Sequence, residues 1–375
     1  MKIAYFVHDL NDPAVHRRMR MLQRGGADVA LIGFCRGAAP ARVEGCVPTV
    51  LGRTHDARLL HRVLVTARAA IGVGRLAKAV AGADVVIARQ LEMLVVGERA
   101  RRRHAPTATL VFECLDIHRL MLSRRLPGRV MRLIEGSLLA RCSLLVVSSQ
   151  GFVREHFEKS YRSVPPVLLV ENKVLAFEYD PPVPAAAGLP AGPPWRIGWF
   201  GNIRCRRSLL LLAGLTRRVP GGVEVVIRGR PALTAIPDFR EIVEAHPGIS
   251  FKGPYDRRMD LASIYGDVHY VWAMDFFEAG GNSEWLLPNR LYEGSLFGAV
   301  ALAYGPVETG RWLRSHRAGV IFEEPLAAGL EDFFAGVDGD AYRSARSAVA
   351  RIPIDALVDG EIDCVALVDA LCAPV

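Results

Sequence analysis

Short apolar runs alternate along the chain with amphipathic stretches long enough to form helices. The first run, Ile3–Val7, has no polar interruption, which is typical of a strand buried on both faces of a parallel sheet. A helix is predicted next, from Pro13 at its first position to Gln23, and Gly25–Gly26 ends it. A second apolar run, Asp28–Phe34, follows. The opening of the chain therefore predicts a β-α-β unit.

The same alternation continues through most of the sequence. Further strands are predicted at Ala83–Ala88, Thr107–Phe112, Ser143–Ser148 and Val167–Val170, and then at Arg196–Phe200, Val223–Ile227, Ile249–Lys252, Val268–Trp272, Ala299–Ala303 and Gly319–Phe322. Strands that alternate with helical stretches indicate parallel α/β sheets. The expected fold class is α/β, with two Rossmann-like parallel-sheet domains that face each other across a cleft.

An uncharged stretch rich in Pro, Ala and Gly, PPVPAAAGLPAGPP, separates the two series of strands. Such a composition is typical of an extended linker. We expect an N-terminal acceptor domain at 1–180, the linker at 181–195 and a C-terminal donor domain at 196–352. A helix within 353–375 is expected to pack back on the N-terminal domain. Ligands of such sheets bind at the carboxyl ends of the strands, so the cleft is the expected site.

Composition agrees with a globular chain of two domains. Of the 375 residues, 51% are hydrophobic and 23% are charged, which disfavours a disordered or fibrous protein. The charge is uneven, because residues 1–180 carry a net +12 and residues 181–375 a net −4. A basic half indicates that one domain faces an anionic partner, either a membrane surface, a pyrophosphate-linked lipid or nucleic acid.

Cysteine usage and hydrophobic run lengths favour a cytoplasmic protein. The seven cysteines are scattered and form no C-x-x-C pair, so neither a zinc site nor a disulfide framework is indicated. The N-terminal apolar run meets His8 and Asp9 too soon for a signal peptide. No run of 18 uncharged apolar residues predicts a membrane-spanning helix.

The segment Asn282–Gly298, NSEWLLPNRLYEGSLFG, concentrates residues suited to a nucleotide. Asn289, Arg290 and Glu293 share one face near the start of a predicted helix. A helix N-terminus offers unpaired N–H groups to a diphosphate, and a carboxylate one turn later can accept both hydroxyls of a ribose. The alternative is structural, with Glu293 paired to Arg290 and Asn289 serving only as a helix cap.

This segment resembles the donor site of glycosyltransferase family 4 and its GT-B relatives. The resemblance lies in Pro288–Glu293, followed by Gly298–Val300. It implies GT-B architecture and a role for Glu293 in holding the donor ribose. The family separates its two acidic residues by seven positions, whereas eight separate Glu284 from Glu293. Contacts expected of Glu284 can therefore come from Asn282 or Ser283 instead.

Other stretches resemble the same family in order along the chain. Arg196–Ser208 is similar to its first donor-domain strand and loop, which implies close approach of the donor at Gly201 and diphosphate binding by Arg204 with Arg206 or Arg207. The alternative for these arginines is a solvated basic loop. Val225–Pro231, which contains Arg228, resembles the second strand, and Phe251–Tyr255 resembles a loop that contacts the base. Asp12–Leu31 is similar to the opening segment.

Polar residues that follow strands of the N-terminal domain are the candidate catalytic groups. Asp9 follows the first strand, and Asp116 and His118 follow Thr107–Phe112. A carboxylate there can act as general base in an inverting transfer. Resemblance to family 4 implies retention, in which the leaving diphosphate can take the proton while Arg204 stabilises its charge. The alternative for His118 is a hydrogen-bonded histidine at the end of a strand.

Basic amphipathic stretches distinguish the N-terminal half. Arg58–Val80 and Arg119–Arg141 mix Arg with Leu, Val and Ile, and Glu98–His104 adds three consecutive arginines. Helices of this kind can lie on an anionic membrane, each basic residue contributing about 1 kcal/mol. Solvated helix faces are the alternative. Nucleic acid is not expected, because interleaved aromatic residues and known binding motifs are missing from these stretches.

The expected function is a hexosyltransferase-like enzyme of polysaccharide biosynthesis. The donor is expected to be a UDP- or GDP-sugar, and the acceptor a glycan or a polyprenyl-pyrophosphate-linked glycan, in metal-independent chemistry without a further cofactor. The expected location is the cytoplasm, peripheral on the inner face of the membrane. A sugar-nucleotide epimerase remains an alternative. The first strand–helix turn, His8–Pro13, lacks the G-x-G-x-x-G of a dinucleotide oxidoreductase, and a non-catalytic sugar-binding module is disfavoured by the arginines.

Overall fold

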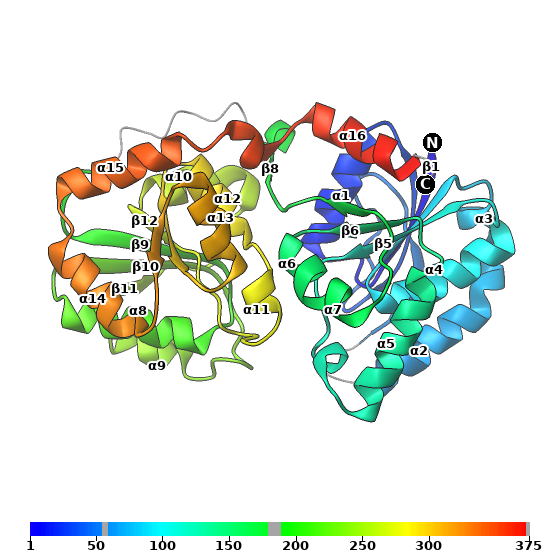
Figure 1. Ribbon diagram of the computed structural model, residues 1–375, viewed down its shortest axis with the longest axis horizontal. Helices are drawn as coiled ribbons and strands as arrows, with labels where there is room; N and C mark the ends of the chain where they lie inside the picture. The colour runs from blue at the N-terminus through cyan, green and yellow to red at the C-terminus, as the bar shows by residue number, and fades with distance from the viewer. Residues whose placement is uncertain (55–58, 179–188, 373–375) are drawn as a thin grey trace. The chain divides into compact units, whose positions relative to one another are not determined.

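The computed structural model describes residues 1–54, 59–178 and 189–372 of the chain (Figure 1). It divides into two compact units, the N-terminal unit of Met1–Glu171 with Gly360–Val375 and the C-terminal unit of Asn172–Asp359. The division falls at residue 171, nine positions before the predicted end of the first domain. Residues 181–188 of the predicted linker lie outside the described residues, and Trp195 already belongs to a strand.

The N-terminal unit is built on a parallel sheet of seven strands in the order β3-β2-β1-β4-β5-β6-β7. The strands are β1 Lys2–Val7, β2 Asp28–Cys35, β3 Thr49–Arg53, β4 Val85–Arg89, β5 Thr109–Cys114, β6 Leu144–Val147 and β7 Val167–Leu169. The chain winds outward from β1 in one direction and then from β4 in the other. The carboxyl ends of β1 and β4 therefore flank the switch point where ligands of such sheets bind.

The helices of this unit begin with α1, Pro13–Arg24, which starts at the proline that the sequence predicts for its first position. Asp12 accepts a hydrogen bond from the N–H of Ala14 at 2.9 Å. The other helices are α2 Leu59–Ile71, α3 Ala77–Val80, α4 Leu91–His104, α5 Leu126–Leu139, α6 Gln150–Phe152, α7 Glu158–Ser160 and α16 Glu361–Cys372. A short 3₁₀ helix, η2, spans Arg119–Leu122.

The last helix, α16, belongs to the N-terminal unit although it follows the C-terminal unit in sequence. It packs on α1 beside Gly25, where a Cβ would lie 2.2 Å from the carbonyl oxygen of Cys364. Arg24 Nη1 forms an ion pair with Glu361 Oε1 at 2.9 Å. The glycine that ends α1 is thus also the point of closest approach for α16.

The C-terminal unit contains a parallel sheet of six strands in the order β11-β10-β9-β12-β13-β14. These are β9 Trp195–Ile203, β10 Val223–Pro231, β11 Ile249–Phe251, β12 Tyr270–Trp272, β13 Val300–Tyr304 and β14 Val320–Phe322. The helices are α8 Arg206–Arg218, α9 Phe239–Glu244, α10 Arg257–Gly266, α11 Asn282–Trp285, α12 Asn289–Leu296, α13 Glu308–His316, α14 Leu326–Gly336 and α15 Gly339–Ala350. The switch point here lies between β9 and β12.

Every predicted strand is present, and the fold class is confirmed as α/β with parallel sheets. Strand β3 was not predicted, nor was the small sheet of β8, Val174–Leu175, with β15, Val358–Asp359. β3 carries Gly52 and Arg53 and is only partly buried, so it lacks the continuous apolar run of the other strands. Arg58 of the predicted basic helix lies outside the described residues.

Candidate active site

Two glycines shape the carboxyl end of the sheet in the C-terminal unit. Gly201 on β9 and Gly229 on β10 are paired in the sheet and have φ angles of 110° and 132°. A Cβ on Gly229 would lie 1.8 Å from the carbonyl oxygen of Gly201, so only glycine fits there. A Cβ on Gly201 would meet no atom within 4 Å. The backbone at Gly201 therefore borders open space, and close approach of a donor there stays a prediction.

The loop after β9 and the loop after β12 bring two arginines to one turn. Arg204 Nη2 lies 3.5 Å from Asp275 Oδ2, and its guanidinium lies over the ring of Phe277 at 4.8 Å. The guanidinium of Arg207 lies over the ring of Phe276 at 4.3 Å. Stacking on aromatic rings orients the planar guanidinium groups. The edge of each also meets a carboxylate, since Arg207 Nη2 forms an ion pair with Glu324.

Arg206 does not join this turn. Its Nη2 is 2.6 Å from Asp238 Oδ2, next to α9, and half of its side chain is exposed. Consecutive residues at the start of a helix point about 100° apart, which explains why Arg206 and Arg207 diverge. Of the two arginines that the sequence offers as the partner of Arg204, the structure brings Arg207 to the turn.

The N-terminus of α12 carries a third arginine. Arg290 Nη2 donates to the carbonyl oxygen of Met274 at 2.8 Å, and its Nε is buried without a hydrogen-bond partner among the described residues. The residue before the helix is Pro288, which provides no side-chain cap, and Asn289 is the exposed first residue of α12. The interpretation of Asn289 as the helix cap is therefore wrong, and the first N–H groups of α12 are uncapped.

Glu293 is buried one turn into α12, with 2% of its surface exposed. Its Oε1 accepts a hydrogen bond from Arg257 Nε at 2.8 Å and its Oε2 accepts one from Tyr265 Oη at 2.9 Å. Burial and the nearby carboxylate raise the pKa of Tyr265, so the phenol keeps its proton. Arg257, rather than Arg290, is thus the ion-pair partner of Glu293. The two partners fix its orientation, and its contact with a ribose stays a prediction.

Asn282 and Glu284 make contacts within their own loop. Asn282 Nδ2 donates to Glu278 Oε2 at 2.6 Å, and Glu284 Oε1 accepts from the N–H of Gly280 at 2.6 Å. Both contacts shape the turn that leads into α11. These contacts do not bear on donor binding, so the roles of Asn282 and Glu284 there stay predictions.

Arg228 lies on a face of β10 rather than at its end. Its Nη2 is 3.4 Å from the carbonyl oxygen of Pro254 and 3.9 Å from Asp260 Oδ2. It lines a pocket with Arg196, Glu224 and Lys252 along the strands. The described contacts of Arg228 thus differ from those of Arg204, Arg207 and Arg290, which all involve the segment 274–277.

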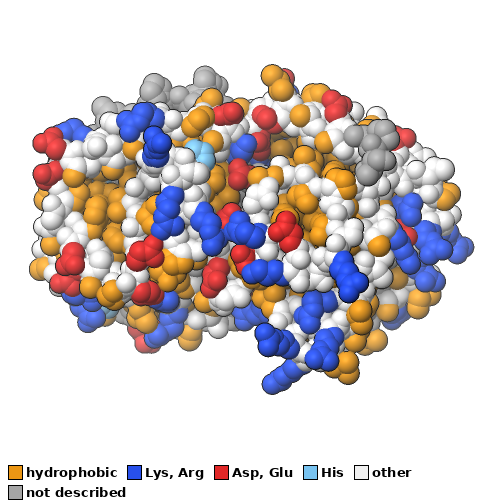
Figure 2. Space-filling model, in the orientation of Figure 1, with side chains coloured by type: hydrophobic (Ala, Val, Ile, Leu, Met, Phe, Trp, Pro, Cys, Tyr) orange, Lys and Arg blue, Asp and Glu red, His pale blue; other side chains and the backbone are white. Residues whose placement is uncertain are grey.

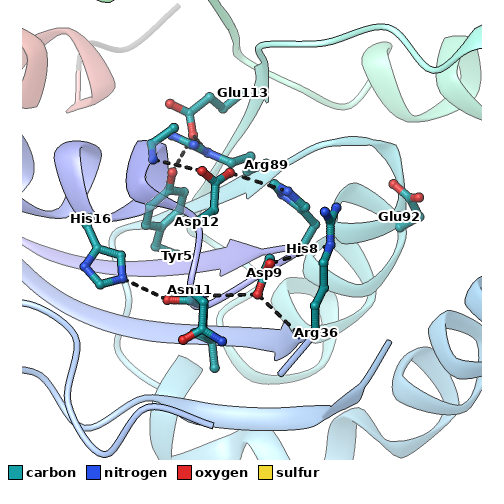
Figure 3. A network of polar contacts seen from close by, with 12 residues as sticks. Tyr5, His8, Asp9, Asn11, Asp12, His16, Arg36, Arg89, Glu92 and Glu113 are labelled. Atoms are coloured by element: carbon teal, nitrogen blue, oxygen red, sulfur yellow. Dashed lines mark hydrogen bonds and ion pairs between the residues drawn. The ribbon is translucent and has the colours of Figure 1, made fainter. Parts of the chain in front are cut away.

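In the N-terminal unit, Asp9 holds the turn after β1 (Figure 3). Its Oδ1 accepts from the N–H groups of Asn11 at 3.2 Å and Arg36 at 3.3 Å, and its Oδ2 lies 3.5 Å from Arg36 Nε. Asp116 and His118 are exposed in the loop after β5. His118 Nδ1 accepts from the N–H of Leu120 at 3.3 Å, which starts η2. Catalytic roles for these three residues remain predictions.

A buried charged network that was not predicted from the sequence lies between β1, β4 and β5. Glu113 accepts hydrogen bonds from Tyr5 Oη at 2.6 Å, Arg18 Nε at 2.6 Å and Arg89 Nε at 2.8 Å. Burial alone would raise the pKa of Glu113, but the charges of Arg89 and Arg18 outweigh burial and lower it to about 2. Burial and the charge of Glu113 raise the pKa of Tyr5, although the charge of Arg89 lowers it.

The signal for this network was present in the sequence. Arg89 ends the strand VVIAR and Glu113 is next to last in the strand TLVFEC, where a strand buried on both faces should carry no charge. Two such residues on adjacent strands, paired in the register of the sheet, are expected to neutralise each other.

None of the described helices is long and apolar enough to cross a membrane. No group of three or more His, Cys, Asp or Glu side chains suited to a metal ion was found within residues 1–54, 59–178 and 189–372.

Comparison with known proteins decides the family. No family model matches the sequence. The chain is 43% identical to the succinoglycan biosynthesis protein ExoL of Rhizobium meliloti over 377 aligned positions, which cover 99% of this chain and 93% of that protein. The chain belongs to the ExoL family.

Solved structures that resemble this ExoL-family chain show the fold alone, because their identities are low. Sucrose-phosphate synthase from Thermosynechococcus elongatus has a TM-score of 0.72 at 13% identity, covering 99% of this chain and 98% of that one. Anabaena HepE in complex with UDP has a TM-score of 0.69 at 12% identity and 99% coverage of both chains. WaaG, a glycosyltransferase of lipopolysaccharide biosynthesis, has 0.64 at 11%, covering 98% and 99%. The predicted GT-B architecture is confirmed.

Proposed function

We propose that this chain is a glycosyltransferase that moves a sugar from a nucleotide-diphosphate donor to a glycan or lipid-linked acceptor in polysaccharide biosynthesis. The observation that carries the proposal is the near full-length similarity to a protein of succinoglycan biosynthesis. The GT-B fold and the arginine-lined turn of the C-terminal unit support it. The motifs that resemble glycosyltransferase family 4 make assignment to that family part of the same proposal.

The donor site is proposed at the switch point of the C-terminal sheet. Arg204 and Arg207 would hold the diphosphate, Arg290 would approach it from α12, and the uncapped N–H groups of α12 add a positive dipole end. Gly201 leaves room for the donor. HepE, which shares the fold, was solved with UDP and with UDP-glucose. A UDP- or GDP-sugar is the donor class that these groups suit.

The same arginines support metal-independent transfer. Three guanidinium groups near one turn can offset the charge that develops on a leaving diphosphate, which is the role a divalent cation plays in other transferases. Retention of the anomeric configuration is part of the proposal through the resemblance to family 4. Release of the diphosphate would then be assisted by arginine rather than by an enzyme carboxylate.

The acceptor is proposed to be membrane-linked, and helix α5 supports this. Five large apolar side chains on η2 and α5 are exposed: Leu122 37%, Leu126 73%, Val130 44%, Leu133 74% and Ile134 41%. Residues 126, 130, 133 and 134 follow the spacing of one helix face. Arginines surround them, and no acidic residue occurs between Asp116 and Glu135. Figure 2 shows basic and hydrophobic side chains together over this part of the N-terminal unit.

This composition suits an anionic membrane surface. Arg124, Arg125 and Arg129 are exposed beside the apolar face. Apolar side chains can enter the boundary between headgroups and acyl chains while arginines contact phosphates, a combination that gives reversible binding. The proposed location is therefore peripheral, on the inner face of the cytoplasmic membrane. A lipid-linked acceptor would be presented at that surface.

A transfer assay tests the proposal. The full chain would be incubated with labelled UDP- or GDP-sugars and a membrane lipid extract from the source cells. The expected result is labelled sugar in the lipid fraction, with release of the nucleoside diphosphate and the donor's anomeric configuration in the product.

An enzyme structure described as a putative UDP-N-acetylglucosamine 2-epimerase shares the fold at a TM-score of 0.59. Epimerised donor without transfer to lipid would favour that second function and contradict the first.

A further inference from the structure

Two loops of the C-terminal unit meet at the switch point of its sheet, between β9 and β12. The two strands are paired over two residues each, near the start of β9. β12 then ends at Trp272, whereas β9 runs on to Ile203. The loop that begins at Arg204 and the segment 274–277 therefore lie beyond the paired part of the two strands. Contacts between side chains and backbone have to hold these loops together, at the place where parallel sheets bind their ligands.

One buried side chain joins the two loops. Cys205, with 4% of its surface exposed, follows Arg204 and directly precedes α8. Its Sγ accepts a hydrogen bond from the N–H of Phe276 at 3.4 Å, although the two residues are 71 positions apart in the sequence. Sulfur is a weak acceptor, but the burial of Cys205 limits competition from water. Cys205 thus connects the end of β9 to the segment that follows β12.

The same sulfur atom caps helix α8. It accepts from the N–H of Ser208 at 3.4 Å and from the Ser208 hydroxyl at 3.2 Å, and Ser208 is fully buried. Three donors therefore converge on Sγ, two from the start of α8 and one from the segment after β12. Ser, Thr, Asp and Asn are the residues preferred at a helix N-cap. Capping alone therefore does not account for a cysteine at this position, whereas the link to Phe276 does.

Phe276 is the residue through which this link reaches the arginines. Arg207 Cζ lies over its ring, 4.3 Å from the centroid. The next ring, that of Phe277, lies 4.8 Å from Arg204 Cζ. The backbone at Phe276 sets the position of both rings, and Cys205 holds that backbone. Side chains that bind a ligand keep their geometry only where supporting contacts fix them.

We propose that Cys205 is a positioning residue of the donor site, which holds Phe276 and, through it, the two stacked arginines. The proposal rests on the proposed function, since it requires that a nucleoside diphosphate binds at Arg204 and Arg207. It adds that the spacing of the two guanidinium groups depends on the sulfur that links the loops. Cys205 itself does not contact the diphosphate in this proposal.

Serine in place of Cys205 separates capping from the link. Serine is a preferred N-cap and keeps the bond to the N–H of Ser208, but its oxygen lies closer to Cβ and falls short of Phe276. Cys205→Ser should leave the melting temperature within about 2 °C of the wild type. The dissociation constant of UDP or GDP, measured by ligand-observed NMR with the full chain, should rise about fivefold, as loss of one hydrogen bond implies.

Two further variants serve as comparisons for Cys205→Ser. Cys205→Ala removes the cap as well as the link, so it should weaken nucleotide binding to a similar extent and also lower the melting temperature. Cys142→Ser changes a buried thiol of the N-terminal unit. It is the matched control and should leave the affinity for UDP or GDP within about twofold of the wild type.

A double-mutant cycle tests whether Cys205 acts through the arginines. In protein that already carries Arg204→Met and Arg207→Met, Cys205→Ser should change the dissociation constant by less than about twofold, because the groups that it positions are gone. Equal fold-changes in the two backgrounds would overturn the proposal, and so would unchanged affinity in Cys205→Ser alone. Both results would leave the donor site intact. Absence of UDP and GDP binding by the wild type would instead contradict the donor site, and this proposal with it.

Discussion

Both units carry arginines at the switch point of a parallel sheet, but the two sets are held in different ways. In the N-terminal unit, Arg18 and Arg89 are buried and share one carboxylate, Glu113. In the C-terminal unit, Arg204 and Arg207 are about one third and one half exposed and rest on aromatic rings. Charge that is buried around a shared carboxylate fixes structure. Arg204 and Arg207 each also pair with a carboxylate, but an exposed guanidinium can exchange that partner for a phosphate.

The largest effect expected from this comparison is on stability, at Glu113. Glu113→Gln should lower the free energy of unfolding of the N-terminal unit by about 3–5 kcal/mol, because two buried guanidinium groups lose their counter-charge. Glu224→Gln is the control, since Glu224 pairs with Arg196 at the surface of the C-terminal unit; it should cost less than about 1 kcal/mol. Urea unfolding measures both. Equal effects of the two changes would remove the distinction between the units.

The stability of the fold should fall in acid because Glu113 becomes protonated. The folded pKa of Glu113, about 2, lies below its ordinary value of 4.5, so ionised Glu113 stabilises the fold above pH 4.5. That stabilisation, on the order of 3 kcal/mol, is lost as the pH falls from 4.5 towards 2. Melting temperatures measured across this range should fall less steeply for Glu113→Gln than for the wild type. Parallel curves would contradict the assigned network.

The next effect is on nucleotide binding, at Arg290. Arg290→Met should raise the dissociation constant of UDP or GDP about tenfold to a hundredfold, because a charge-assisted hydrogen bond contributes about 1.5–3 kcal/mol. Glu113→Gln should leave this constant within about twofold in protein that remains folded. Calorimetry at a temperature below the melting transition of both variants checks the pair. A larger loss of nucleotide affinity in Glu113→Gln than in Arg290→Met would reverse the roles given to the two units.

Membrane binding should depend on the N-terminal unit alone. Leu133→Glu, on the exposed face of α5, should weaken binding to vesicles of anionic phospholipid about tenfold, because a buried leucine contributes about 1.5–3 kcal/mol. Met259→Glu changes an equally exposed apolar residue of the C-terminal unit and should have little effect. Flotation at low salt measures both. Equal losses would assign the effect to added charge and refute the α5 surface.

The smallest effect should come from chelation. If Arg204, Arg207 and Arg290 offset the charge of the diphosphate, EDTA should leave the transfer rate within about twofold of the untreated enzyme. Addition of Mg²⁺ or Mn²⁺ after chelation should not raise the rate. Activity that requires a divalent cation would contradict metal-independent transfer.

The sequence predicted the fold well because periodicity reports burial directly. All the strands it assigned as continuous apolar runs are present, while β3 was missed because Gly52 and Arg53 interrupt its run. Candidate site residues were harder, because side-chain direction depends on the neighbouring chain. Arg206 and Arg207 are adjacent in sequence, yet Asp238 and Phe276 hold them apart.

Ion pairs between residues distant in sequence were the second feature that the sequence did not predict. Arg257 pairs with Glu293 across 36 positions, and Arg18 pairs with Glu113 across 95. No local spacing predicts such contacts. A charged residue at the end of an apolar strand, such as Arg89, does predict that a partner exists. It does not say which residue the partner is.

The most direct measurement for the central claim compares Arg204→Met with Arg206→Met in nucleotide binding. Both changes remove one partly exposed arginine of the same loop and helix start, but only Arg204 lies at the turn of Asp275–Phe277. Calorimetry with UDP and GDP should show affinity for at least one nucleotide, lowered tenfold or more by Arg204→Met and within twofold of wild type for Arg206→Met. Absence of nucleotide binding, or equal losses in the two variants, would contradict the proposed donor site.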